Sequence, residues 1–291
     1  MRFVQAFLRL LRRSPKVSVG LAIAVLIVVV GVLHAPIVQA VGQGQDPLTI
    51  GFAPRFLPPS TSHLLGTDAD GRDELALIVT GLWTSLQIGL LAGVLSTIIG
   101  VVIAFVAAYR GGIFDSVLST ITDLFMVIPT FPLLIAFSGF AKTTSFVEIA
   151  LILAVFSWAG AARVIRSQVL SLRTRPYIDL ARATKESDLE IIFLELPPNM
   201  LPYIALGLTQ AIIGSIFALV GLEVIGLGPG SVIDLGLLIN VALGSGALTL
   251  GAWPMFVGPI FVIVLLFFSL NLVNLGLEEV YNPRLRKVVG G

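Results

Sequence analysis

Cysteine is absent from the 291-residue chain, and histidine occurs only twice, as His34 and His63. Without cysteine the chain has no disulfide framework, no thiolate metal site and no cysteine nucleophile. Two histidines cannot by themselves build a usual zinc site. The formal net charge is only +1, so no overall electrostatic field points to nucleic acid as a partner.

Charged residues are also scarce. They make up 12% of the chain, about half of the 25% usual for soluble globular domains. Apolar residues make up 56%, and a soluble protein of this size could not bury so many of them, because most of its surface must be wetted. The composition therefore excludes a soluble cytosolic enzyme, a disordered chain and a fibrous protein, and it predicts an integral membrane protein.

Long apolar runs give the predicted fold, because crossing a bilayer core takes about 20 apolar residues in a helix. The expected spans are 17–41, 82–108, 117–140, 147–162, 201–226 and 253–277. The runs are continuously apolar rather than alternating, which disfavours a β-barrel. We therefore predict an all-α membrane protein with six transmembrane helices. The apolar run 232–243 is too short to span and is expected to form a re-entrant or interfacial helix.

Lysine and arginine predict the orientation. They concentrate in the N-terminal segment 1–16, the 163–198 loop and the tail 278–291, whereas the opposite side holds only Arg55, Arg72 and Lys142. Both termini are therefore expected in the cytoplasm of a multi-pass cell-membrane protein, and the polar, proline-rich loop 42–81 outside it. The segment 1–16 has an amphipathic pattern typical of a helix lying on the inner leaflet.

Small residues follow one another at every fourth position along the second span, from Gly81 through Ser85, Gly89 and Gly93 to Thr97. Such spacing lets two helix backbones approach closely. The pattern fits packing within the chain or a seam with another subunit.

The groups that enzymes need are missing. No histidine lies in the middle of a span, which disfavours a serine–histidine intramembrane protease, and there is no phosphate-binding loop of the type G-x-x-x-x-G-K-[ST]. The turn at 68–73 resembles a calcium loop only superficially, because its glycine and ligand positions do not fit. Asp123 and Glu223 are the acidic candidates within or near the spans, either for function or for simple interfacial exposure. We expect no enzyme activity and no cofactor on this chain.

The most informative stretch is the charged loop 163–198. Thr174 and Pro176 are suited to start a short helix over 177–184. Ser187 and Glu190 form an S-x-x-E capping box, which predicts a second short helix after a turn at 185–187, and Pro197 and Pro198 are expected to end it. A charged helix with small central residues can dock in a groove of a cytosolic partner, although a solvated linker would show the same pattern.

This loop resembles the coupling motif of ABC importer permeases, whose pattern begins E-A-A-x-x-x-G. Asp179-Leu180-Ala181 stands at the E-A-A position and Pro198-Asn199 at its close, whereas Lys185 replaces the glycine and Pro197 replaces a leucine. Three further segments resemble the dipeptide/oligopeptide/nickel permease family, in its second permease subunit type: the run from His63 to Asp73, the turn from Tyr109 to Asp115, and Asn282 to Arg286.

The resemblance implies a permease subunit of an ATP-driven, binding-protein-dependent importer that works by alternating access. It implies a heterodimer with a homologous permease, two cytosolic ATP-binding subunits that carry ATP-Mg, and an extracytoplasmic substrate-binding protein. The expected ATPase-coupling residues are Asp179, Ala181, Arg182, Ala183, Lys185, Ser187 and Glu190. The expected cargo is a di- or oligopeptide, with short oligosaccharides or nickel as alternatives. A channel or ion-coupled carrier is the rival class.

Overall fold

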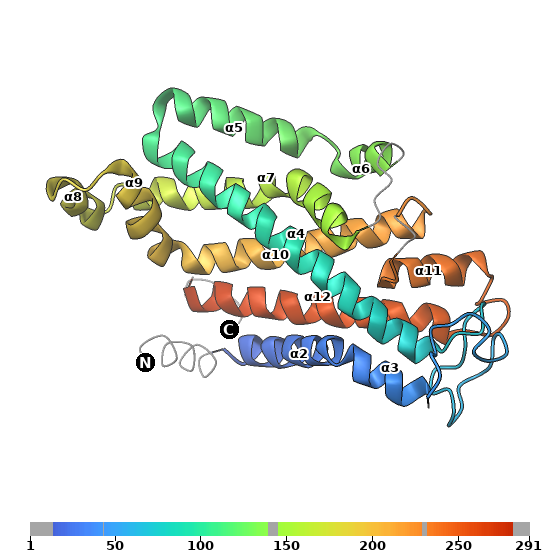
Figure 1. Ribbon diagram of the computed structural model, residues 1–291. Coiled ribbons are helices and arrows are strands. Elements are labelled where there is room, and N and C mark those ends of the chain that lie inside the picture. Colours follow the sequence, from blue (N-terminus) through green and yellow to red (C-terminus); the bar gives the residue numbers. More distant parts are fainter. Residues whose placement is uncertain (1–13, 43, 139–144, 229–231, 282–291) are drawn as a thin grey trace, which may run out of the picture. The chain divides into compact units, whose positions relative to one another are not determined.

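The computed structural model describes residues 14–42, 44–138, 145–228 and 232–281. Within these ranges the chain is helical, and its only β pairing is an isolated bridge between Thr67 and Asp73. The helices are α2 Pro15–Val32, α3 His34–Gly42, α4 Glu74–Arg110, α5 Gly112–Val127, α6 Thr130–Ser138, α7 Phe146–Leu172, α8 Pro176–Ala183, α9 Asp188–Glu190, α10 Leu196–Val224, α11 Leu235–Gly244 and α12 Pro254–Tyr281, with a π-helix η1 at Ile191–Glu195 between α9 and α10 (Figure 1).

Five helices of the described part are long and apolar enough to cross a membrane: α2, α4, α7, η1 with α10, and α12. The count is five and not the expected six, because the 117–140 run forms two shorter helices, α5 and α6, in place of one span. Pro129 is the physical cause. It disfavours helical backbone at the preceding residue, and Ile128 accordingly adopts φ −62° and ψ 121°, an extended conformation that ends α5.

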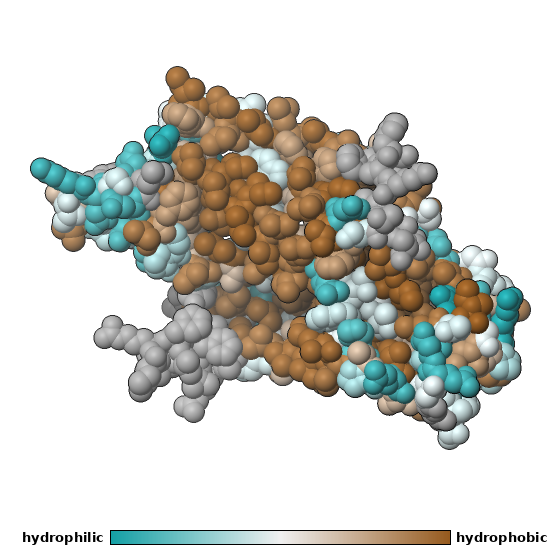
Figure 2. All heavy atoms as spheres, viewed as in Figure 1, coloured by the Kyte–Doolittle hydropathy of each residue, from teal (hydrophilic) through white to brown (hydrophobic). Residues whose placement is uncertain are grey.

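The first expected span is also divided, at Leu33 between α2 and α3. Most of the short apolar run 232–243 is helical, in α11 Leu235–Gly244, as expected, and its re-entrant or interfacial position stays a prediction. Figure 2 shows broad apolar surface along the long helices, while hydrophilic residues gather over α8 and α9. The N-terminal segment up to residue 13 and the tail beyond residue 281, including the motif from Asn282 to Arg286, lie outside the described residues.

The chain forms two compact units. Unit 1 contains 1–88, 135–149 and 216–291, and unit 2 contains 89–134 and 150–215. In unit 1, α2 and α12 lie side by side (Figure 1). A Cβ atom on Gly20 would stand 2.7 Å from the carbonyl oxygen of Ser269. The absence of a side chain there therefore lets the two helices approach closely.

The loop 44–73 of unit 1 is held by its own polar groups. The Asp68 carboxylate accepts from the amide nitrogens of Asp70 and Arg72 at 2.9 and 2.8 Å, and from Arg72 Nε at 2.7 Å. Asp73 caps α4 by accepting from the Ala76 amide at 3.1 Å, and its other oxygen lies 2.9 Å from His63 Nδ1. The calcium-like run is thus a turn that leads into α4, and its carboxylates are engaged by amides and side chains of the protein.

The small residues of α4 pack within the chain. In unit 1, Ser85 Oγ accepts from the Leu235 amide at 3.1 Å, at the start of α11. In unit 2, a Cβ atom on Gly93 would lie 3.0 Å from the Ile212 nitrogen of α10, and one on Gly100 would lie 3.0 Å from the Trp158 oxygen of α7. The contacts of Ser85 and Gly93 support intrachain helix packing, the first of the two interpretations, and a seam with another subunit stays a prediction.

Candidate functional site: the α7–α10 loop

The candidate site is the segment 173–195, which lies in unit 2 and which we call the α7–α10 loop. Its first helix, α8, occupies Pro176–Ala183, within one residue at each end of the expected helix over 177–184. Asp179 lies in the first turn of α8, where a negative charge interacts favourably with the helix dipole.

The turn after α8 depends on a residue in left-handed backbone conformation. Lys185 has φ 62°, and the Glu186 amide donates to the carbonyl oxygen of Ala181 at 3.2 Å. This is the six-to-one hydrogen bond of a Schellman helix end, which usually has glycine at the left-handed position. Lys185 stands where the coupling motif of the resembled family has glycine, and it adopts the conformation that glycine would adopt more easily.

The second helix starts with the predicted capping box. Ser187 Oγ accepts from the Glu190 amide at 3.3 Å, and Glu190 Oε2 accepts from the Ser187 amide at 2.7 Å. The same hydrogen bond to the carboxylate lowers the pKa of Glu190 below its ordinary value. Ser187 and Glu190 therefore fix the direction in which the chain leaves the turn.

The prediction that Pro197 and Pro198 end this second helix is wrong. The chain continues from α9 through the π-helix Ile191–Glu195 directly into α10, whose first turn contains both prolines. The wider π turn changes the hydrogen-bond register just before the prolines, and the helical path continues past them although neither proline has an amide hydrogen to donate.

A hydrophobic cluster fixes the inner side of the loop to three long helices. Ile178 of α8 and Ile191 and Ile192 of η1 have no exposed surface. They belong to one buried cluster with residues of α4, α7 and α10, namely Ala104, Phe105, Ala108, Tyr109, Ile165, Val169, Leu196 and Met200. One side of the loop is therefore part of the packed interior of unit 2, which fixes the loop in place.

Ala181 also belongs to this cluster and is only 5% exposed. Its expected place on the docking face is corrected. A spacing of three residues puts Ile178 and Ala181 on the same side of α8, and that side packs inward. Asp179, Ala183 and Lys185 are exposed, as are Ser187 and Glu190, whereas the side chain of Arg182 lies outside the described part.

Sequence reasoning missed three apolar residues on the outer side of the loop. Leu180 and Leu194 are each 65% exposed, and Phe193 is 48% exposed. The sequence did hold a signal for Leu180, which stands between Asp179 and Ala181. Side chains two positions apart on a helix point in nearly opposite directions, so Leu180 must point away from Ile178. Large apolar side chains on a loop rich in charge are typical of a protein interaction surface.

A bidentate ion pair holds α5 against α7 close to the loop. Arg166 donates from Nε to Asp115 Oδ1 at 2.7 Å and from its terminal nitrogen to Oδ2 at 2.6 Å. These hydrogen bonds lower the pKa of Asp115 below its ordinary value. Nearby, Arg173 donates to the carbonyl oxygen of Ala108 at 2.8 Å and so fastens the end of α7 to α4. Nothing in the sequence pattern predicted these partners.

The two acidic residues expected in or near the spans have different surroundings. Asp123 of α5 pairs with Arg163 of α7, and both side chains are more than half exposed. Glu223 of α10 is 2% exposed and lies in unit 1 close to Gly236 and the N-cap residue Asp234. In the described ranges, no three histidine, aspartate or glutamate side chains group closely enough to hold a metal ion.

Comparison with known proteins gives the family. Residues 70–287 match the family described as "Binding-protein-dependent transport system inner membrane component". The chain is 33% identical over 245 residues to the oligopeptide transport system permease protein OppC of Mycobacterium tuberculosis, covering 83% of each chain. It is 30% identical over 277 residues to OppC of Bacillus subtilis, covering 94% of this chain and 88% of the relative.

A putative peptide transport system permease protein of Brucella suis is 34% identical over 287 residues, covering 96% of this chain and 91% of the relative. The family match covers most of the chain and includes α4 to α12, the α7–α10 loop and the turn that contains Asp115. The chain thus belongs to the family of binding-protein-dependent transport system inner membrane components, as a multi-pass permease subunit.

Proposed function

We propose that this chain is the permease subunit of an ATP-driven importer of di- and oligopeptides, and that the α7–α10 loop couples it to cytosolic ATPase subunits. The peptide cargo rests on the relatives, whose names are those of oligopeptide and peptide permeases. The coupling role rests on one observation above the others: the loop is buried on one side in the core of unit 2 and carries exposed Leu180, Phe193 and Leu194 on the other.

The docking face consists of Leu180 with Asp179, Ala183 and Lys185 around it. An apolar centre with a charged rim is the usual organisation of an interface between folded proteins. Arg182 remains a proposed member of this face. Ala181 instead supports the face from below, and Ser187 and Glu190 set the angle of the turn.

Movement of the docking face would be transmitted by packing. The cluster joins α8 and η1 to α4, α7 and α10, and a close-packed interior is displaced as a body rather than compressed. ATP binding and release in the partner subunits would therefore move these helices and alternate the access of the cargo site. Such coupling requires that the partners contact the loop differently in their two states.

The remaining parts of the importer are a homologous permease, two ATP-binding subunits carrying ATP-Mg, and an extracytoplasmic binding protein. We place both termini and the α7–α10 loop in the cytoplasm and the 44–73 loop outside. In this arrangement the chain itself hydrolyses no ATP. Purified alone in lipid nanodiscs it should show no turnover, and ATP hydrolysis by the isolated chain would contradict the proposal.

The substitution Leu180→Asp tests the docking face. It replaces an apolar contact, worth about 2 kcal/mol when a leucine is buried, by a charge. The expected result is a loss of at least about tenfold in co-purification of the ATPase subunits and in ATP-dependent uptake. Leu64→Asp is the matched control, because Leu64 is 63% exposed on the 44–73 loop. Equal retention of the ATPases by both variants would refute the assignment.

The cargo is tested by competition. Uptake of a labelled tripeptide into vesicles that contain the assembled importer should be inhibited by other short peptides, and not by maltose or nickel ions, which represent the alternative cargoes. Uptake that survives ATP depletion but stops when the ion gradient is dissipated would instead identify an ion-coupled carrier.

A further inference from the structure

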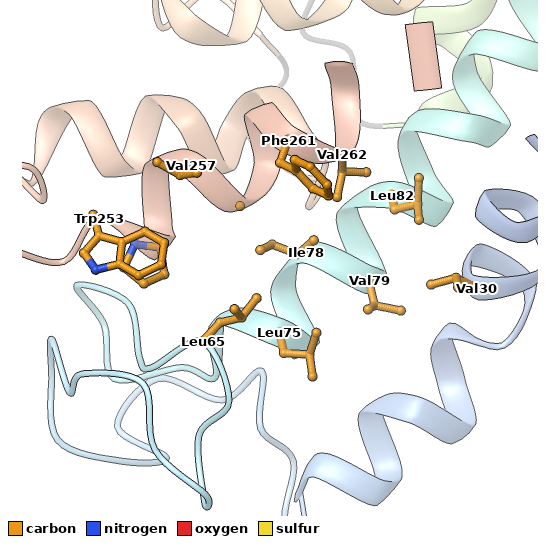
Figure 3. Close-up of a pocket in the computed structure, with 12 residues that line it drawn as sticks. Val30, Leu65, Leu75, Ile78, Val79, Leu82, Trp253, Val257, Phe261 and Val262 are labelled. Carbon is orange, nitrogen blue, oxygen red and sulfur yellow. The ribbon is translucent and has the colours of Figure 1, made fainter. Parts of the chain in front are cut away.

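Unit 1 contains an apolar cavity of about 360 Å³ at the end of α4 that begins at Glu74. It lies where the first turns of α4 and α12 meet the last part of α2 and the 44–73 loop. Figure 3 shows side chains from all four segments around a common space. The floor is formed by Ile78, Val79 and Leu82 of α4, which are 3–5% exposed.

The lining is almost entirely hydrocarbon. Each of its residues is apolar, from Val30 of α2 and Leu65 of the 44–73 loop to Pro254 and Val262 of α12, and the only side-chain nitrogen is that of the Trp253 indole. A peptide, a sugar or a metal ion needs several polar partners when it leaves water. The cavity offers only the Trp253 indole nitrogen, too few partners for a cargo path for such substrates.

The cavity opens along one face of α12. Trp253, Val257 and Phe261 line it at intervals of four residues and are 54, 45 and 62% exposed. On a membrane-spanning helix an apolar face that no other protein covers is in contact with lipid. Trp253 directly precedes the first residue of α12, at the level where tryptophan anchors to the headgroup region.

A missing side chain lets α12 approach α4 closely beside the recess. Gly258 is part of the lining, and a Cβ atom placed there would stand 2.5 Å from Ile78 Cδ1. The lining residues of α4 run from Leu75 to Leu82, which is a rise of about 10 Å along the helix. The cavity is therefore an elongated recess that runs from the interface level toward the hydrocarbon core.

We propose that this recess is a lipid-binding site that holds one acyl chain of a membrane phospholipid, with the headgroup outside beside Trp253. Its volume lies at the lower end of the range of about 300–1,000 Å³ for small-molecule sites, which suits part of one chain and not two. The surrounding bilayer supplies this ligand at high concentration. The site does not depend on the identity of the cargo.

The test uses the assembled importer in nanodiscs of phosphatidylethanolamine and phosphatidylglycerol, with a small share of a phospholipid that carries a photoreactive diazirine in one acyl chain. After irradiation, mass spectrometry locates the labelled peptides. Label should concentrate on 74–82 and 253–262. Val257→Trp, which places a large side chain at the rim without entering the floor, should reduce this labelling roughly fivefold. Val264→Trp is the matched control, since Val264 is 58% exposed on the same face of α12 two turns further on, and it should change the labelling little.

Two results would overturn the proposal. One is labelling spread evenly along the exposed face of α12 and unchanged by Val257→Trp, which means ordinary annular lipid. The other is occupation by protein. Because the chain has no cysteine, Val257→Cys introduces a single thiol, and its efficient cross-linking to the partner permease would show that a subunit covers the recess. Thermal melting of each variant verifies that it is folded.

Discussion

Replacing Lys185 by glycine should stabilise the turn between α8 and α9. The left-handed conformation costs a residue with a Cβ atom about 1–2 kcal/mol, and Lys185 has φ 62°. Glycine avoids this cost but loses more chain entropy on folding, a loss of about 0.5–1 kcal/mol. The expected net gain is therefore about 0.5–1 kcal/mol of local stability.

Amide hydrogen exchange measures this local stability directly, because exchange of the hydrogen-bonded Glu186 amide requires the helix end to open. Lys185→Gly should slow exchange of the peptide that covers α8 and the turn by a factor of about two to five. Lys185→Ala is the control, since it removes the ammonium group but keeps the Cβ atom, and it should leave the rate nearly unchanged. If alanine protects as well as glycine, or if glycine does not protect, the backbone is not strained at this residue and our explanation of the turn is wrong.

Three further predictions concern single side chains. Asp115→Asn should lower the stability of the chain by up to about 1 kcal/mol, because the ion pair with Arg166 is partly exposed. That pair lowers the pKa of Asp115 from 3.8, so its contribution to stability is present above pH 3.8 and is lost as the pH falls further. Below pH 3.8 the melting temperature of the wild type should therefore fall more steeply with pH than that of the variant. Tyr177→Phe should be neutral or stabilising in thermal melts, because the buried Tyr177 hydroxyl has no hydrogen-bond partner in the described part of the chain, and a clear loss of stability would reveal a partner. Asp234→Ala should cost about 1–2 kcal/mol, because Asp234 accepts from two amides at the start of α11, whereas Asp234→Asn keeps an acceptor and should cost less; equal losses would mean that charge, not capping, is decisive.

Sequence reasoning was most successful where a short-range rule applies. The capping box at Ser187 and the short helix α8 depend on residues within four positions of one another, and both were found. The sequence alone did not show that Pro129 would divide the 117–140 span into the separate helices α5 and α6. Proline also misled, because the π turn before Pro197 has no sequence signal that distinguishes it from a helix end.

Long-range contacts were beyond the sequence. The inward side of α8 is decided by a cluster whose members come from helices far apart in the chain, so a small residue such as Ala181 fits equally well on a surface or in an interior. The pairing of Asp115 with Arg166 is of the same kind, since an acidic residue in one helix can meet any of several arginines. Which residues are buried, and which partners they pair with, depends on tertiary packing. The local pattern of one sequence does not reveal it.

The backbone of unit 2 can bend at the break between α5 and α6. At Ile128 and Pro129 the regular ladder of main-chain hydrogen bonds is interrupted, whereas α4, α7 and α10 are clamped together around the cluster. A movement of these three helices would bend the chain most easily at the junction between α5 and α6, where a change of backbone dihedral angles breaks no helical hydrogen bond. A substitution that allows continuous helix here, such as Pro129→Ala, would make bending at this junction harder.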